Sequence, residues 1–520
     1  MSDNTKAKTK HILPLLPLII FSSLVPLTVY AKYVYLSKFM AAHWMGEPVS
    51  ADVFSYYKMV LIIICAVFAL AIMIKRLVKT EIKLKPTVPL LVSVIYGVLI
   101  VLSIIFSEYT SVALWGAPER YEGGIVLISY MIMFIYAVSI LDNIKNIKIV
   151  INCMLVSASV ILIIGILQFF GYDIFGSDFF RALFNMKPNA RNPFDFVLFV
   201  KEYVSYGTLY NSNHLSLYIS LIFPAALAFY SMQLKPKGRI LGIALVFLCV
   251  LSFIGCNVSG GYLAAIATIV LLLFLAFPYI KRNLKNMIIL SVSVICLLVA
   301  ANFLSGGRVL ANLKLSSITN EEDRLEISYN KIFIDNIVLG YRDIFIDTRE
   351  YDLAIENEDN YIHVYDEAGN ELETELSLNE KPGVRYKYIY KFTDDKYSSY
   401  SVMASSDYSI VTVFAGSSVM DFHMTDQGVM VPGMNNMLDV IREVERNPLL
   451  YKMPTIFSGR GYIWSGMFPL LRDTILIGNG PDTTFLTYPQ HDFIGKVNMG
   501  STFRTVIEKP HCYYIQLAHD

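Results

Sequence analysis

YYKMVLIIICAVFALAIMI, residues 56–74, is the run of apolar residues that sets the class of this protein. A helix needs about 20 apolar residues to cross the hydrocarbon core of a bilayer. The run contains no Asp, Glu or Arg, and Lys58 lies near one end, where its side chain can extend to the membrane surface. We therefore predict a membrane span here, followed by the basic segment KRLVKTEIKLK, residues 75–85.

Eight further segments share this length and composition. None has an acidic residue or an arginine in its middle, where a charge would cost about 2.5–3.5 kcal/mol. The sequence thus predicts a polytopic α-helical membrane protein. Its nine predicted spans cover residues of about 12–31, 56–74, 87–107, 123–141, 149–170, 215–233, 240–256, 262–280 and 287–304.

The composition divides the chain into two parts. Of its 520 residues, 55% are hydrophobic and 17% are charged, against about 25% charged in soluble domains, which argues against a cytosolic enzyme. Residues 1–304 contain 24 basic and 12 acidic residues, whereas residues 305–520 contain 19 and 31. We therefore predict a transmembrane domain over 1–304 and a water-soluble module over 305–520. The module lacks basic clusters interleaved with aromatic residues, which argues against a nucleic-acid partner.

The basic residues also predict the orientation in the membrane. The N-terminus and alternate loops contain 16 basic residues, all on one side of the predicted spans, and such residues favour the cytoplasmic side. The short opposite loops contain Lys32, Lys38 and Arg120. We therefore expect a multi-pass plasma-membrane protein with a cytoplasmic N-terminus and a large extracytoplasmic C-terminal region, together with an external loop over 171–214.

The module itself divides into a β-rich insertion, 331–432, and a helical segment, 433–520. The runs YIHVY (361–365), YKYIY (386–390) and SIVTVF (409–414) are typical of strands, and DEAGNE (366–371) supplies turn residues. After Pro432-Gly433 a helix is predicted from the spacing of Met437, Val440, Ile441 and Val444, and a second helix is predicted over about 461–472.

The segment PTIFSGRGYIWSGMFPLLRDTILIGNGPDTTF, residues 454–485, contains the first candidate catalytic residue, Arg460. Ser458 can cap the helix, which places Arg460 at the positive end of the helix dipole. A cation is unfavourable there unless an anion such as pyrophosphate binds to both the guanidinium and the free amides. The alternative is an exposed arginine whose charge is solvated.

A second candidate is His511, in EKPHCYYIQ, residues 508–516. An imidazole with a pKa near 6.5 can act as a general base toward a sugar hydroxyl at neutral pH. The alternative is a histidine among tyrosines at a membrane boundary.

Weaker candidates lie in the outer loops. Arg120, Tyr121 and Glu122 could bind a phosphate, although a solvated ion pair of Arg120 with an adjacent glutamate is favoured. Asn211 and Asn213 begin a span and either line a cavity or cap the helix. Tyrosines could also stack on sugar rings, but packing on the strand face is favoured; they are residues 361, 365, 386, 388 and 390.

Taken together, these segments resemble the O-antigen ligase and O-antigen polymerase superfamily of bacterial membrane glycosyltransferases, in the Gram-positive type with a β-rich insertion. The resemblance covers most of the chain and rests on the order of its motifs. These are GAPERYEGG (116–124), GTLYNSNH (207–214), SGG (259–261), SGRGYIW (458–464), GNGPDTTF (478–485) and PHCYYIQ (510–516).

The resemblance implies transfer or polymerisation of an undecaprenyl-pyrophosphate-linked glycan onto a sugar or lipid acceptor, without cofactor or metal, at the outer face of the membrane. It also implies that Arg460 binds the pyrophosphate and that His511 activates the acceptor hydroxyl. Three features depart from the family: Gly260-Gly261 replaces a frequent arginine, Cys512 stands where asparagine is usual, and about three further spans would follow residue 520. The run YYIQLA, 513–518, is also similar to the start of a further span, so either the sequence is truncated or this segment lies on the surface.

Two other classes of function remain open at this stage. The spans could anchor a non-enzymatic receptor or a carbohydrate-binding surface protein, or the chain could be an inactive truncated ligase homologue. A transporter ranks last, because paired repeats and charges in the middle of spans are absent from the sequence.

Overall fold

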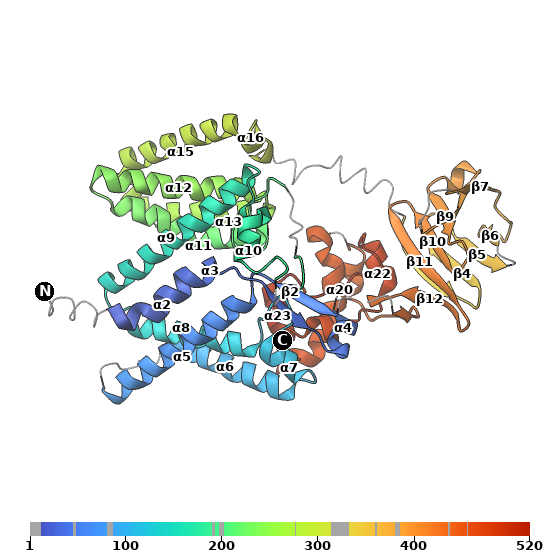
Figure 1. Ribbon diagram of the computed structural model, residues 1–520, viewed down its shortest axis with the longest axis horizontal. Helices are drawn as coiled ribbons and strands as arrows, with labels where there is room; N and C mark the ends of the chain where they lie inside the picture. Colours follow the sequence, from blue (N-terminus) through green and yellow to red (C-terminus); the bar gives the residue numbers. More distant parts are fainter. Residues whose placement is uncertain are drawn as a thin grey trace. The chain divides into compact units, whose positions relative to one another are not determined.

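A computed structural model describes residues 12–44, 48–80, 87–189, 193–196, 202–275, 277–313, 332–358, 361–379, 385–434, 437–454 and 456–520. The chain forms two compact units, which we call the helical unit and the mixed unit (Figure 1). The helical unit comprises residues 1–33, 51–98 and 118–320, and the mixed unit comprises residues 34–50, 99–117 and 321–520. The mixed unit therefore contains two segments, 34–50 and 99–117, that precede the predicted module, 305–520, in the sequence.

Six helices among the described residues are long and apolar enough to cross a membrane. The other three predicted spans coincide with shorter apolar helical segments, Leu13–Leu27, α8 (Gly124–Ile140) and Gly260–Leu275 of α13 (Ser259–Leu275). The six long helices are α5 (Tyr56–Val78), α6 (Val88–Phe106), α9 (Ile144–Phe169), α11 (Ser212–Met232), α12 (Pro236–Cys256) and α15 (Leu284–Leu304).

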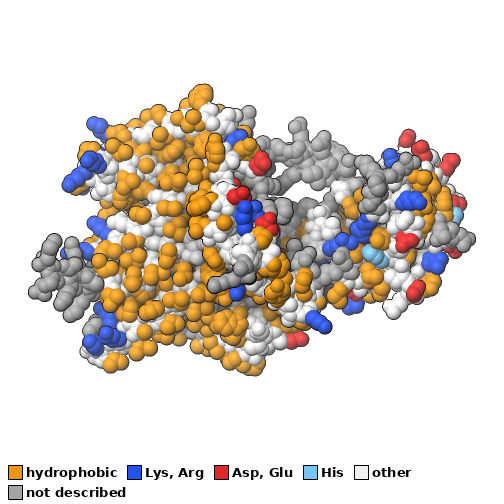
Figure 2. Space-filling model, in the orientation of Figure 1, with side chains coloured by type: hydrophobic (Ala, Val, Ile, Leu, Met, Phe, Trp, Pro, Cys, Tyr) orange, Lys and Arg blue, Asp and Glu red, His pale blue; other side chains and the backbone are white. Residues whose placement is uncertain are grey.

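The helical unit is packed inside and apolar outside. Ile161 of α9, Ile219 of α11 and Cys249 of α12 are fully buried in one core cluster. Hydrophobic side chains cover the flank of the helices, and basic side chains gather at one end (Figure 2). Shorter elements of this unit are α10 (Asp178–Leu183), α14 (Phe277–Arg282) and α16 (Arg308–Leu313).

In the mixed unit, residues 334–432 form a β-rich region, as predicted. Two antiparallel sheets are connected as simple meanders, so that each strand pairs with its neighbours in sequence. One sheet contains β3 (Ile334–Leu339), β4 (Asp343–Thr348), β5 (Leu353–Glu358) and β6 (Tyr361–Tyr365). The other contains β7 (Thr374–Leu378), β8 (Tyr388–Phe392), β9 (Tyr400–Ala404), β10 (Ile410–Ala415), β11 (Ser418–Thr425), β12 (Gly428–Pro432) and β13 (Leu438–Asp439).

The two sheets share one hydrophobic core. Ile355 of β5 and Val413 of β10 are fully buried in it, because alternate residues of each strand face inward. The predicted turn at 366–371 is confirmed by a hydrogen bond from Asp366 N to Asn370 O, 2.9 Å. The short helix α22 (Phe493–Asn498) adds Phe493 to the same core.

The helix predicted after Pro432-Gly433 is absent. Met437, Val440, Ile441 and Val444 have helical spacing, but Leu438 and Asp439 form β13, which pairs with β12, and residues 440–447 have no regular structure. Pairing with an existing sheet edge has overridden a local periodicity of only four residues.

The second predicted helix is confirmed and is longer than expected, because α20 covers Ile456–Thr474. It packs against α23 (Tyr513–His519). The cap predicted for Ser458 lies outside the described side chains. The mixed unit also contains α4 (Lys38–His43), α7 (Thr110–Trp115), α19 (Pro448–Tyr451) and α21 (Thr484–Thr487). The short strands β1 (Lys32–Tyr35) and β2 (Val49–Asp52) pair with each other.

Candidate functional site

One candidate catalytic residue, Arg460, lies on helix α20, and the segment that contains the other, His511, contacts the same side of this helix. Arg460 precedes Trp464 by four residues, so the two side chains lie on one side of α20. The indole Nε1 of Trp464 donates a 2.8 Å hydrogen bond to the carbonyl oxygen of Pro510. The turn that contains His511 therefore lies against the side of α20 that carries Arg460.

Both candidate side chains are accessible. Arg460 and His511 are exposed to solvent. The backbone of His511 has a φ of 51°, a left-handed conformation that residues other than glycine seldom adopt. Strained backbone of this kind persists only where the surrounding structure imposes it, and it is frequent at functional sites.

A buried scaffold lies behind this surface. Tyr462 of α20 is fully buried in a cluster that also includes Ile507, and Ile515 of α23 packs against it. Arg446 forms a bidentate ion pair with the buried carboxylate of Asp492, the residue that caps α22. The hydroxyl of Tyr462 donates to the backbone oxygen of Asp492, 3.4 Å away. The scaffold thus connects α20, α22 and the segment before His511.

The GNG sequence, residues 478–480, forms a tight turn against the end of α6. Gly480 has a φ of 102°, and a Cβ atom there would lie 2.5 Å from Ser107 Oγ and 2.6 Å from Ala113 Cβ. Ser107 Oγ donates a 2.6 Å hydrogen bond to Asn479 O. The turn therefore requires glycine, both for its backbone conformation and for its close approach to α6 and α7.

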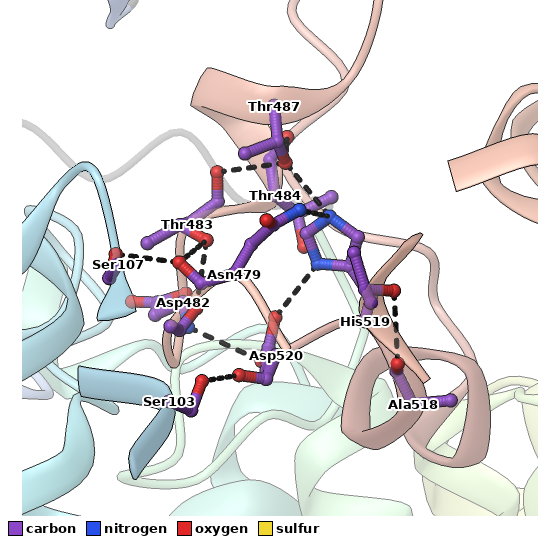
Figure 3. A network of polar contacts seen from close by, with 12 residues as sticks. Ser103, Ser107, Asn479, Asp482, Thr483, Thr484, Thr487, Ala518, His519 and Asp520 are labelled. Carbon is purple, nitrogen blue, oxygen red and sulfur yellow. Dashed lines mark hydrogen bonds and ion pairs between the residues drawn. The ribbon is translucent and has the colours of Figure 1, made fainter. Parts of the chain in front are cut away.

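A second histidine, His519, lies at the centre of a polar network (Figure 3). Its Nε2 lies 2.9 Å from Thr487 Oγ1 and 3.3 Å from Asn479 Nδ2, and its Nδ1 lies 3.2 Å from Asp520 Oδ1. A neutral imidazole protonated on Nδ1 satisfies all three contacts, since it donates to the carboxylate and accepts from the hydroxyl and the amide.

The hydroxyl of Thr487, the imidazole of His519 and the carboxylate of Asp520 resemble a catalytic arrangement of nucleophile, base and acid. Their geometry, however, indicates that the network holds the end of α23 against the GNG turn. His519 has no exposed surface, so its imidazole cannot reach a substrate. The backbone beside it binds the GNG turn, with Asn479 N donating to His519 O at 2.9 Å and Gly480 N donating to Asp520 O at 3.0 Å. His519 is not among the candidate residues predicted from the sequence. The local feature that could have indicated it is its position directly after the run YYIQLA, 513–518.

In the helical unit, the loop that contains Arg120 is partly buried. Nε and Nη2 of Arg120 are shielded from solvent. The ring of Tyr121 packs edge-on against Tyr56 at 5.3 Å, and burial, with the nearby charge of Asp52, raises the pKa of its hydroxyl. Glu122 is exposed. A role of these residues in phosphate binding stays a prediction.

The two asparagines of the helical unit have different surroundings. Asn211 Oδ1 accepts a 2.9 Å hydrogen bond from His214 N at the start of α11, which confirms the capping alternative. Asn213 is exposed. Lys58 does not extend outward as predicted, because its Nζ donates a 2.6 Å hydrogen bond to Thr208 O.

The tyrosines of the β-rich region mainly pack against one another. Tyr390 is fully buried, with its hydroxyl 3.3 Å from that of Tyr408, and Tyr388 stacks on Tyr408 at 4.7 Å. The packing alternative is therefore confirmed for Tyr388 and Tyr390. Tyr361 is 38% exposed and packs edge-on against Tyr390.

Among the described residues, no three His, Cys, Asp or Glu side chains lie close enough together to hold a metal ion. Comparisons of the chain with protein families, with curated proteins and with solved structures found no match.

Proposed function

We propose that this protein is a membrane glycosyltransferase of the O-antigen ligase type, which transfers or polymerises an undecaprenyl-pyrophosphate-linked glycan at the outer face of the plasma membrane. The observation that carries the proposal is the hydrogen bond from Trp464 to Pro510, which brings the His511 turn to the Arg460 side of α20. The helices long and apolar enough to cross a membrane give the chain access to a lipid-linked donor.

In the proposed reaction, the two exposed side chains act on opposite ends of one displacement. His511 accepts the proton of an acceptor hydroxyl as that oxygen attacks the anomeric carbon of the donor glycan. The bond between that carbon and the pyrophosphate oxygen breaks, and the pyrophosphate leaves with the electron pair. Arg460 stabilises the negative charge of the leaving pyrophosphate by bidentate hydrogen bonding.

The test is complementation of a deletion strain with full-length variants. We expect deletion to remove a surface polysaccharide and to cause accumulation of the lipid-linked glycan. Arg460→Ala and His511→Ala should fail to restore the polymer, with transfer reduced about 100-fold or more, because a single charge-stabilising donor contributes that much. Complementation by both variants at the wild-type level would reject the assignment.

Two matched control variants distinguish loss of catalysis from a general loss of folding or stability. Arg472→Ala removes another exposed arginine of α20, one that pairs with Glu445, and it should complement fully. His363→Ala removes a histidine of β6 that pairs with Glu371, and it should also complement.

A second candidate function is a membrane-anchored carbohydrate-binding protein without enzymatic activity. The observation that favours it is the pair of sheets in the β-rich region, which pack around one hydrophobic core. In that case glycan binding should persist in the Arg460→Ala and His511→Ala variants, and deletion should leave the length and amount of the surface polymer unchanged.

A further inference from the structure

The helical unit contains a cavity of about 600 Å³ at the basic end of α5. Its walls come from the start of the first apolar segment, from the end of α5, and from the junction between α8 and α9. All of these elements belong to one compact unit. The volume is in the range of small-molecule binding sites and is far larger than a single phosphate group needs.

Three cationic side chains, Lys75, Arg76 and Lys79, line this cavity, and Asp142 is its only acidic lining residue among those described. The remaining walls include Leu13, Leu15, Ile72 and Ile140. Cations at the end of a helix also favour its dipole, so the charges alone do not indicate a ligand. The combination of a positive rim with apolar walls, however, matches an anionic group that is attached to an apolar chain.

The independent observation is Asn146, which lines the cavity and has only 7% of its surface exposed. Its Nδ2 donates to Ile140 O at 3.3 Å and to Asp142 Oδ1 at 3.4 Å. Because both partners are acceptors, they fix the orientation of the amide. Its Oδ1 is buried and accepts no hydrogen bond from any described residue. A buried acceptor without a donor is costly, and a ligand hydroxyl would satisfy it.

We propose that this cavity binds the headgroup of an anionic glycerophospholipid that carries hydroxyl groups. Lys75, Arg76 and Lys79 surround the phosphate diester, Asn146 Oδ1 accepts a hydrogen bond from a headgroup hydroxyl, and the apolar walls contact the glycerol and the first acyl carbons. Basic pockets between spanning helices are known sites for such headgroups. The proposal is independent of the glycosyltransferase assignment.

The test is lipid binding to the full-length protein by native mass spectrometry. Phosphatidylglycerol is the expected ligand. Phosphatidylmethanol has the same charge without hydroxyls, and phosphatidylcholine has no net charge. Wild-type protein should retain phosphatidylglycerol in preference to both. Equal retention of phosphatidylglycerol and phosphatidylcholine would overturn the proposal without any variant.

Variants then locate the site. Lys75→Gln, Arg76→Gln and Lys79→Gln combined should weaken phosphatidylglycerol binding about tenfold or more, because each cation near the membrane surface contributes to anionic-lipid affinity. The matched control is Lys281→Gln, Arg282→Gln and Lys285→Gln combined. It removes the same residue types from exposed positions outside the cavity. An equal loss in the two triple variants would indicate diffuse charge attraction and overturn the site.

Asn146→Leu tests the hydrogen bond and should remove the preference for phosphatidylglycerol over phosphatidylmethanol while leaving binding of the latter unchanged. A retained preference would overturn the role of Asn146. Addition of inorganic phosphate distinguishes a lipid from a free anion. We expect millimolar phosphate to leave the bound lipid in place, whereas its displacement would indicate a free-phosphate site.

Discussion

His511 and Asp482 are two residues whose backbones adopt positive φ, 51° and 63°. At Asp482 the surrounding contacts explain the conformation, since the buried carboxylate accepts a 2.6 Å hydrogen bond from Ala117 N. His511, by contrast, is exposed, and its position is defined by the Trp464 contact with the preceding Pro510. A strained backbone that presents an exposed imidazole is consistent with a role in substrate binding or catalysis.

Lys496 is a residue whose charge is costly to the fold. Its side chain is fully buried, and its Nζ donates to the backbone oxygens of Gln490 and Phe503. Burial lowers the pKa of its ammonium group from 10.5 to about 8, although the charge of Asp492 acts in the opposite direction. In the unfolded chain the same lysine keeps its proton up to about pH 10.5.

This difference predicts a specific pH dependence of stability. Between about pH 8 and pH 10.5 the unfolded state binds more protons than the folded state, so the free energy of unfolding rises with pH. The contribution of Lys496 should be about 1 kcal/mol per pH unit within this interval. Thermal unfolding of the wild type and of Lys496→Met, compared at pH 7.5 and 9.5 (about two pH units apart), measures it. Parallel pH profiles for the two proteins would contradict the prediction.

At the scale of elements, the GNG turn connects segments that are far apart in the sequence. Ser107 of the α6–α7 junction, Asn479 of the turn and His519 of α23 are joined through hydrogen bonds in one network. The turn therefore packs against α6, α7 and α23, in addition to connecting α20 with α21.

Gly480→Ala tests this packing. The new methyl group would lie 2.5 Å from Ser107 Oγ, so the turn must move away from α6. We expect a loss of about 2–4 kcal/mol in the free energy of unfolding, from steric overlap together with backbone strain. Gly369→Ala is the matched control, because Gly369 also has positive φ but nothing within 4 Å of its missing Cβ. Its loss should be about 1 kcal/mol. Equal melting temperatures for the two variants would contradict the packing role.

Elements whose signal is local could be predicted from the sequence. The six long apolar helices and α20 are predicted correctly because each is a continuous apolar or periodic run, and the strands at 361–365 and 409–414 alternate or are β-branched. The helix over 437–444 was predicted wrongly, since pairing of Leu438 and Asp439 with β12 is a long-range choice. The Trp464 contact joins residues 46 positions apart, and no local pattern reports it.

At the scale of the whole molecule, the boundary predicted at residue 305 differs from the boundaries of the compact units, because contacts between distant segments leave no local pattern in the sequence. Residues 34–50 and 99–117 have no polar composition that would assign them to a C-terminal module. They join the mixed unit through specific contacts, such as the edge-on packing of Trp44 on Phe485 at 5.0 Å. Composition identifies an apolar or a polar stretch, but it does not identify the partner against which the stretch packs.

Orientation in the membrane is the remaining property of the whole chain that the proposed function requires. Basic side chains gather at one end of the helical unit while its flank is apolar (Figure 2). In the described helices, Lys75 lies in the last turn of α5, Lys237 in the first turn of α12 and Lys281 in the last turn of α14. Because basic residues are retained on the cytoplasmic side during insertion, we predict that this end faces the cytoplasm and that the β-rich region is extracytoplasmic.

Labelling of introduced cysteines in intact cells tests this orientation. In a Cys512→Ser background, a membrane-impermeant maleimide should label Ser398→Cys, an exposed position before β9, from outside the cell. Lys237→Cys should be labelled only after the membrane is permeabilised, because it lies at the start of α12, in a loop that is predicted to be cytoplasmic. Labelling of both positions in lysed cells serves as the control for accessibility. The reverse pattern in intact cells would place the β-rich region, Arg460 and His511 inside the cell, away from a donor at the outer face, and would reject the proposed function together with the orientation.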